Sequence, residues 1–108
     1  MICMSADLLD GGDGVRFTVR RDGRDLPAFV VRFGGRVYAY LNRCAHVWVE
    51  LDWQPGRFFT VERDYLICAS HGALFEPESG FCVAGPCRGG RLETIPVVER
   101  DGGVFLVE

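Results

Sequence analysis

The chain has 108 residues, of which 48% are hydrophobic and 25% are charged, and its formal net charge is -3 at pH 7. A chain of this length and composition folds as one compact domain. The acidic balance provides no basic field for nucleic acid, and no apolar run approaches the roughly 20 residues that span a bilayer. We therefore expect neither nucleic acid nor a membrane as a partner.

The chain begins with a segment that shows no regular apolar pattern and ends in a Gly- and Asp-rich run. Residues 1–14 are expected to form a flexible tail that carries Cys3 as a free thiol, and residues 15–108 are expected to form the domain. The N-terminus lacks the basic start and apolar stretch of a secretory signal. This predicts a cytoplasmic protein, in which thiols stay reduced.

Short apolar or alternating runs, separated by turn residues, follow this tail. Residues 15–20 alternate with period two, residues 28–33 form an apolar run, and a Gly-Gly pair turns the chain into residues 36–41. Further strands are expected at 58–62, 65–68, 74–76, 80–84, 92–99 and 103–107. No segment has the 3.6-residue apolar period of a capped helix. The sequence therefore predicts an all-β domain of short antiparallel strands.

Cysteine and histidine occur together in two short segments, Cys44-x-His46 and Cys68-x-x-His71. In an extended segment the side chains of residues i and i+2 point to one side, so the first pair can face a common centre. The second pair needs a tight turn, which Gly72 permits. Cysteine and histidine at close spacing in a reducing compartment are more typical of metal ligands than of disulfides. The sequence predicts a metal site with two sulfur and two nitrogen ligands.

Two metal groups are compatible with these ligands. A two-iron cluster would bind both thiolates at one iron and both imidazoles at the other. A structural zinc ion would bind all four in a tetrahedral site and stabilise an interaction module. Zinc sites usually begin with two cysteines spaced by two to four residues and continue with two histidines. The mixed pairs therefore favour the cluster, with zinc as the alternative.

With these segments the sequence resembles the Rieske iron–sulfur family, whose signature is Cys-x-His, a spacer and Cys-x-x-His. The resemblance covers about residues 15–107 and implies the Rieske fold: short antiparallel strands in stacked small sheets, two cluster-binding loops, and a Gly-Pro cover loop, here at Gly85 and Pro86. It also implies one [2Fe–2S] cluster per chain, with four ligands: Cys44, His46, Cys68 and His71. The spacer between the two pairs has 21 residues, more than the family usually has. The extra residues are expected within 48–59, where loop length costs little free energy.

The residues around the expected cluster imply a low reduction potential. High-potential members of the family have a disulfide at the positions of Val49 and Ser70, a serine at Ala73 and a tyrosine at Phe75, and all three additions are missing here. Hydrogen bonds to the sulfur atoms stabilise the additional negative charge of the reduced cluster, so their absence lowers the potential. The resemblance thus implies the low-potential, ferredoxin-like branch.

The sequence leaves the roles of three nearby residues open. Trp48 is either a core side chain or an exposed aromatic residue suited to transient docking. Cys82 and Cys87 flank the cover loop, and they are either two reduced apolar residues or a disulfide that stiffens the loop.

The resemblance implies an electron carrier and not an enzyme, because Rieske oxygenases need a second, larger domain for a mononuclear iron. The protein is expected to take single electrons from a reductase and pass them to an oxygenase or another redox acceptor. The alternative is a small Rieske subunit of a larger, nitrite-reductase-like complex. Relatives of that kind often lack the ligands, whereas this sequence has all four.

Overall fold

The computed structural model describes residues 1–45, 49–87 and 89–107. Within these residues the strands form three small antiparallel sheets, joined by turns and one 3-10 helix, and no α-helix occurs. The all-β prediction is therefore confirmed. No helix of the described residues has the length and apolar character needed to cross a bilayer.

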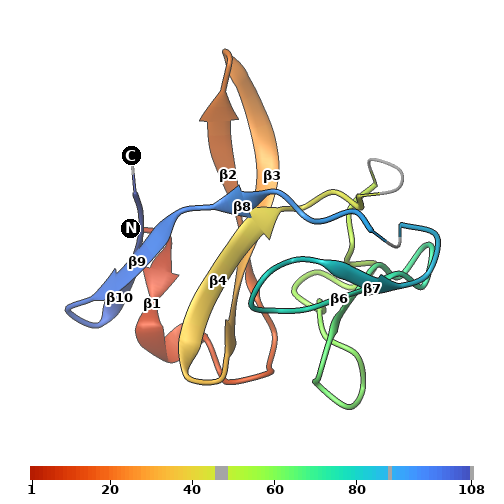
Figure 1. Cartoon of the computed structure of the whole chain (residues 1–108). Coiled ribbons are helices and arrows are strands. Elements are labelled where there is room, and N and C mark those ends of the chain that lie inside the picture. Colours follow the sequence, from red (N-terminus) through yellow and green to blue (C-terminus); the bar gives the residue numbers. More distant parts are fainter. Residues whose placement is uncertain (46–48, 88, 108) are drawn as a thin grey trace.

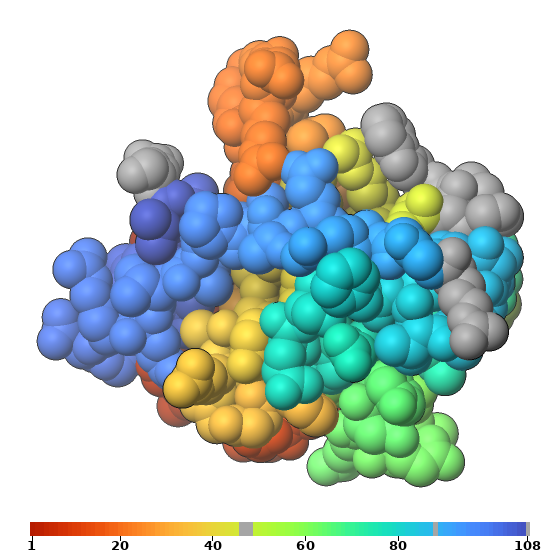
Figure 2. All heavy atoms as spheres, viewed as in Figure 1, coloured from red at the N-terminus to blue at the C-terminus, as the bar shows by residue number. Residues whose placement is uncertain are grey.

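The largest sheet has the strand order β2–β3–β4–β8. Its strands are β2 (Val15–Arg21), β3 (Arg24–Phe33), β4 (Arg36–Leu41) and β8 (Thr94–Ile95). The turn after β3 has two residues, as the Gly-Gly pair predicts, because Phe33 pairs with Arg36. The hairpin of β2 and β3 projects from the body of the molecule (Figure 1, Figure 2). The end of β4 leads directly into the first Cys-x-His segment.

The second sheet has the order β1–β10–β9 and lies at the end of the molecule where both termini are found (Figure 1). Its strands are β1 (Cys3–Met4), β9 (Val97–Arg100) and β10 (Gly103–Leu106). The sequence predicts one strand over 92–99. The structure divides it at Pro96, which has no N–H to donate to a ladder, so β8 and β9 belong to different sheets.

The N-terminal segment differs from the flexible tail expected over residues 1–14. It forms β1 and the 3-10 helix η1 (Ser5–Asp7), and Cys3 and Leu8 are buried in a core cluster with Val104. Arg32 of β3 donates hydrogen bonds to the backbone carbonyls of Ser5 and Leu8. The physical reason is that this segment covers an edge of β10 and buries its own apolar side chains there. Cys3 is a free thiol, as expected, but it lies in the core.

The third sheet has the order β5–β6–β7 and lies at the opposite end of the molecule (Figure 1). Its strands are β5 (Leu66–Ile67), β6 (Leu74–Phe75) and β7 (Cys82–Ala84). The strand expected at 58–62 is reduced to an isolated bridge between Phe59 and Leu66. The second ligand segment lies in the turn between β5 and β6, and the cover loop follows β7.

A cluster of buried residues joins this sheet to the main sheet. Phe29 of β3 and Phe58 of the spacer stack with ring centroids 3.9 Å apart, and both belong to a cluster that contains Cys44, Cys68 and Phe75. The long spacer therefore contributes to the core beside the two ligand cysteines. This places the candidate metal centre at the border between packed core and surface loops.

Candidate metal centre

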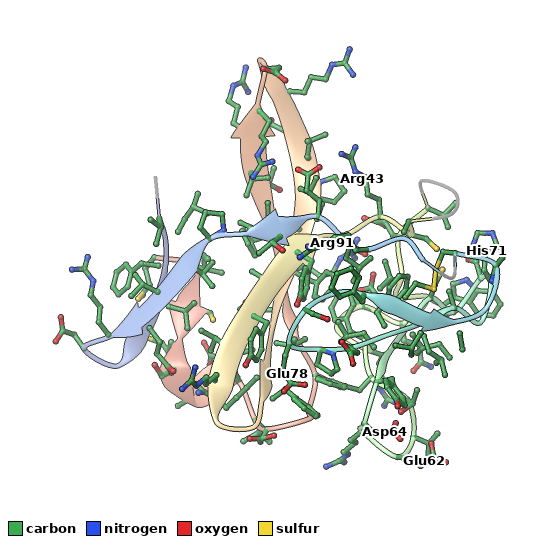
Figure 3. All side chains as sticks on the ribbon, viewed as in Figure 1. Arg43, Glu62, Asp64, His71, Glu78 and Arg91 are labelled. Carbon is green, nitrogen blue, oxygen red and sulfur yellow. A yellow bond between two sulfur atoms is a disulfide. The ribbon has the colours of Figure 1, made fainter. Side chains whose placement is uncertain are left out.

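Three of the four predicted ligands come together in the structure. The ligand atoms of Cys44, Cys68 and His71 all lie within 4.8 Å of one another. Both cysteines are fully buried, whereas His71 is partly exposed at the end of the molecule formed by the loops (Figure 3). The fourth predicted ligand, His46, lies outside the described residues, as does Trp48.

The first ligand loop begins where β4 ends. The N–H of Asn42 donates to the carbonyl of Pro27 in β3 at 2.8 Å, so the chain leaves the sheet in a fixed direction. The N–H of Cys44 donates to the carbonyl of Val49 at 2.8 Å and closes the loop. These two bonds orient Cys44 toward the interior, where its thiol faces that of Cys68.

The second ligand loop is a tight turn between β5 and β6. The N–H of Cys68 donates to the carbonyl of Ala73 at 2.9 Å, and the carbonyl of Cys68 accepts from the N–H of Gly72 at 2.7 Å. Gly72 has a φ of +70°, a conformation that side chains with a Cβ rarely adopt. The turn brings Nδ1 of His71 to 3.6 Å from Sγ of Cys68.

The cover loop packs directly against the second ligand loop. Gly85 has a φ of +95°, and a Cβ built there would lie 2.8 Å from Cα of Ala73. Only glycine allows this approach of two backbones. Pro86 follows, and Cys87 forms a disulfide with Cys82 across a Cα–Cα distance of 6.0 Å. Of the two alternatives for these cysteines, the structure has the disulfide, which joins β7 to the end of the cover loop.

Burial raises the pKa of the Cys68 thiol above its ordinary value, and the adjacent Cys44 thiol raises it further. The neutral form of the Cys68 thiol is therefore favoured when no positive charge is near. A bound metal reverses this preference, since it binds the thiolates and releases the protons. Two buried sulfur atoms and a partly exposed imidazole in converging loops fit an iron–sulfur cluster with mixed ligands.

Two described side chains beside the second ligand loop provide no hydrogen-bond donor. Ala73 and Phe75 are both fully buried and have no hydroxyl group. A disulfide between positions 49 and 70 is impossible, because these residues are Val49 and Ser70. Instead, the indole Nε1 of Trp53 donates to Oγ of Ser70 at 3.0 Å, from the spacer to the second ligand loop.

Three residues beside the site were not predicted from the sequence. Trp53 is 74% exposed next to the second ligand loop, and Asn42 and Asp52 are buried polar side chains near the first. They lie in bends or irregular segments and have no motif spacing that could identify them. The unusual length of the spacer was a signal for Asp52 and Trp53.

A small all-β domain in which two thiols and an imidazole converge from two loops fits the class of iron–sulfur proteins. A family model of the Rieske [2Fe-2S] domain matches residues 1–98, most of the chain. The chain therefore belongs to the Rieske [2Fe-2S] domain family, and its cofactor is a [2Fe–2S] cluster. No curated protein matches the chain.

Solved structures of Rieske ferredoxins have the same fold. The ferredoxin of carbazole 1,9a-dioxygenase from Nocardioides aromaticivorans IC177 is 25% identical, with a TM-score of 0.72 over 98% of this chain and 93% of that chain. The Sphingomonas yanoikuyae B1 ferredoxin is 27% identical, with a TM-score of 0.71 over 99% of this chain and 95% of that chain. A complex of reduced oxygenase and oxidized ferredoxin in carbazole 1,9a-dioxygenase contains a chain that is 26% identical. Its TM-score is 0.74 over 98% of this chain and 89% of that chain.

Proposed function

We propose that this protein is a low-potential Rieske-type electron carrier, without a catalytic site of its own, that passes single electrons from a reductase to an oxygenase or a similar acceptor. The observation that carries the proposal is the convergence of Cys44, Cys68 and His71 within 4.8 Å in a Rieske domain. The cytoplasmic location expected from the sequence belongs to this proposal.

The proposed ligands have distinct roles. Cys44 and Cys68 would hold the inner iron as thiolates, and His46 and His71 would hold the outer iron through their imidazoles. The cluster, when bound, accepts and returns one electron. Both thiols are buried, which supports a sulfur side without water, and His71 is partly exposed, which supports an imidazole side at the surface. A partner would therefore approach from the histidine side.

The likeness to ferredoxins supports a carrier. The chain covers nearly the whole length of the Nocardioides and Sphingomonas ferredoxins, and one similar ferredoxin was solved in complex with its oxygenase. The exposed indole of Trp53 beside Ser70 provides an aromatic contact of the type enriched in protein interfaces. We therefore assign Trp53 to the docking surface for the redox partner.

A reductive titration tests the proposal. The protein should take up one electron per chain, with a midpoint potential near the low end of the Rieske range, about −150 mV, because hydroxyl donors are missing at Ala73 and Phe75. A potential above about +100 mV, in the upper part of the same range, would contradict the low-potential assignment. Absence of any redox-active iron would contradict the carrier function itself.

A further inference from the structure

Two buried polar side chains in the described part of the chain have no role in the ligand set. Asn42 is 1% exposed and Asp52 is 7% exposed. Asn42 precedes Cys44 by two residues, and Asp52 lies in the spacer between the two ligand pairs. Burial of a carboxylate costs free energy unless the charge is paired and hydrogen-bonded. The contacts of Asp52 therefore show which parts of the chain its buried carboxylate holds together.

Both carboxylate oxygens of Asp52 accept a hydrogen bond. Nδ2 of Asn42 donates to Oδ1 at 2.9 Å, and the N–H of Gly56 donates to Oδ2 at 2.9 Å. Nε of Arg16 in β2 lies 3.6 Å from Oδ2, and the Asp52 side chain has no exposed surface. The carboxylate thus ties the end of β4 to the spacer turn, and a cation from β2 balances its charge.

The same network reaches both ligand loops. Oδ1 of Asn42 accepts from the N–H of Leu51 at 2.9 Å, beside Asp52 in the chain. The carbonyl of Leu51 accepts from the N–H of Ala69, the residue after the second ligand cysteine, at 2.9 Å. Since Asn42 also begins the first ligand loop, the spacer residues connect the two loops through a continuous row of hydrogen bonds.

We propose that Asp52 is a positioning residue for the cluster: through Asn42 and Leu51 it fixes the distance between the two ligand loops. The inference rests on the ligand assignment of the proposed function. In high-potential members a disulfide joins the loops, and here Val49 and Ser70 occupy its two positions. Here the buried carboxylate of Asp52 and the long spacer connect the two ligand loops by hydrogen bonds and not by a covalent bond.

The substitution Asp52→Asn tests this role with little change in shape. An amide replaces one acceptor with a donor, so either Asn42 Nδ2 or the Gly56 N–H loses its partner in each orientation of the amide. We expect iron release to a chelator to become about tenfold faster, as for a lost buried hydrogen bond. The electron paramagnetic resonance spectrum of the reduced variant should also broaden, because the loops sample more than one spacing.

Glu50→Gln is the matched control. Glu50 pairs with the same Arg16 at 2.8 Å, but its side chain is 46% exposed. This variant removes one negative charge from the same cation and leaves both hydrogen bonds of Asp52 in place. Its iron release and its spectrum should equal those of the wild type. Equal effects of Glu50→Gln and Asp52→Asn would overturn the proposal, since the charge near Arg16 would then be the cause.

Exchange of the two side chains provides a rescue. With Asn42→Asp and Asp52→Asn combined, the amide at position 52 donates to the carboxylate at position 42 and accepts from Gly56, while the carboxylate still accepts from Leu51. Iron release should return to within about twofold of the wild-type rate, because each hydrogen bond is restored. If Asp52→Asn does not fold, Asn42→Ser breaks the same connection and should accelerate iron release.

The outcomes separate this inference from the proposed function. Wild-type protein that binds no cluster would overturn both. Wild-type protein that binds the cluster, with Asp52→Asn releasing iron at the same rate, would overturn only the role of Asp52. An exchange variant no better than Asp52→Asn alone would do the same, because the hydrogen-bond geometry would then be irrelevant.

Discussion

The two ligand loops are built in different ways. The second loop closes on itself: hydrogen bonds between residues 68 and 73 form the turn, and the pair of Ile67 with Leu74 anchors its two ends. The first loop closes through the bond from Cys44 to Val49, and its flanking residues are held by the buried side chains of Asn42 and Asp52.

This difference shows that one site can combine a loop held by local hydrogen bonds with a loop held by contacts between distant parts of the chain. The second loop requires only a short hairpin and a glycine in the left-handed region. The first requires a spacer that returns to the end of β4 and buries a charge there. Changes in the second loop should therefore act locally, and changes in the spacer should alter the relation between the loops.

The largest effect is expected from loss of a thiolate ligand. Cys44→Ser and Cys68→Ser should each retain less than about a tenth of the wild-type iron, because each removes one of the proposed thiolate ligands, and thermal stability should fall as well. Iron analysis and a thermal melt measure both effects. Cys3→Ser is the control, since Cys3 lies in the sheet at the opposite end of the molecule and should keep its iron. Full iron in Cys68→Ser would disprove the ligand assignment.

The next effect concerns the cover loop. Gly85→Val forces a side chain to within 2.8 Å of the Ala73 backbone, so the loop must move away from the cluster, at a cost on the order of 1–3 kcal/mol. We expect rapid bleaching in air while the circular dichroism of the sheets is retained.

Gly89→Val is matched for backbone strain in this experiment. Gly89 has a φ of +93°, close to the +95° of Gly85, but a Cβ at Gly89 meets no atom within 4 Å. The control should therefore lose some stability and keep its cluster. Equal cluster lifetimes in the two variants would place the cover loop away from the site.

A smaller effect is expected from the turn of the second ligand loop. Gly72→Ala and Gly102→Ala introduce similar strain, about 1 kcal/mol each, because φ is +70° and +73° and neither Cβ meets another atom within 4 Å. The two melting temperatures should fall by similar amounts. Only Gly72→Ala should accelerate the loss of iron, which a chelator assay measures. Faster iron loss in both variants would mean that global unfolding controls release.

The smallest effect is a shift in potential. Ala73→Ser with Phe75→Tyr adds two hydroxyl donors beside the ligand loop, and each bond stabilises the reduced cluster by about 1 kcal/mol, or tens of millivolts for one electron. Voltammetry should show a rise. Phe81→Tyr adds the same hydroxyl at an exposed phenylalanine and should leave the potential unchanged. A fall in potential in the double variant would contradict the hydroxyl explanation.

Much of the fold was predictable because its signals are local. Period-two alternation identified β2, and the Gly-Gly pair identified the turn between β3 and β4. The N-terminal strand was not predictable, since β1 has only two residues and pairs with β10 at the other end of the chain. The division at Pro96 was a missed local signal.

The ligands of the site were predictable from the sequence, whereas the residues that hold the ligand loops were not. The motif spacing identified Cys44, Cys68 and His71, which the structure brings together. Asn42 and Asp52 had no spacing signal, because their contact depends on how the spacer folds back onto β4. A single asparagine or aspartate in a loop is ordinarily exposed, so composition gave no reason to select them.

The proposed function depends on a [2Fe–2S] cluster with mixed cysteine and histidine ligands. The most direct test is the electron paramagnetic resonance spectrum of the purified, reduced protein, recorded together with its iron and zinc content. We expect about two irons per chain and the spectrum typical of mixed ligation. Stoichiometric zinc without iron, in protein produced under iron-replete conditions, would contradict it.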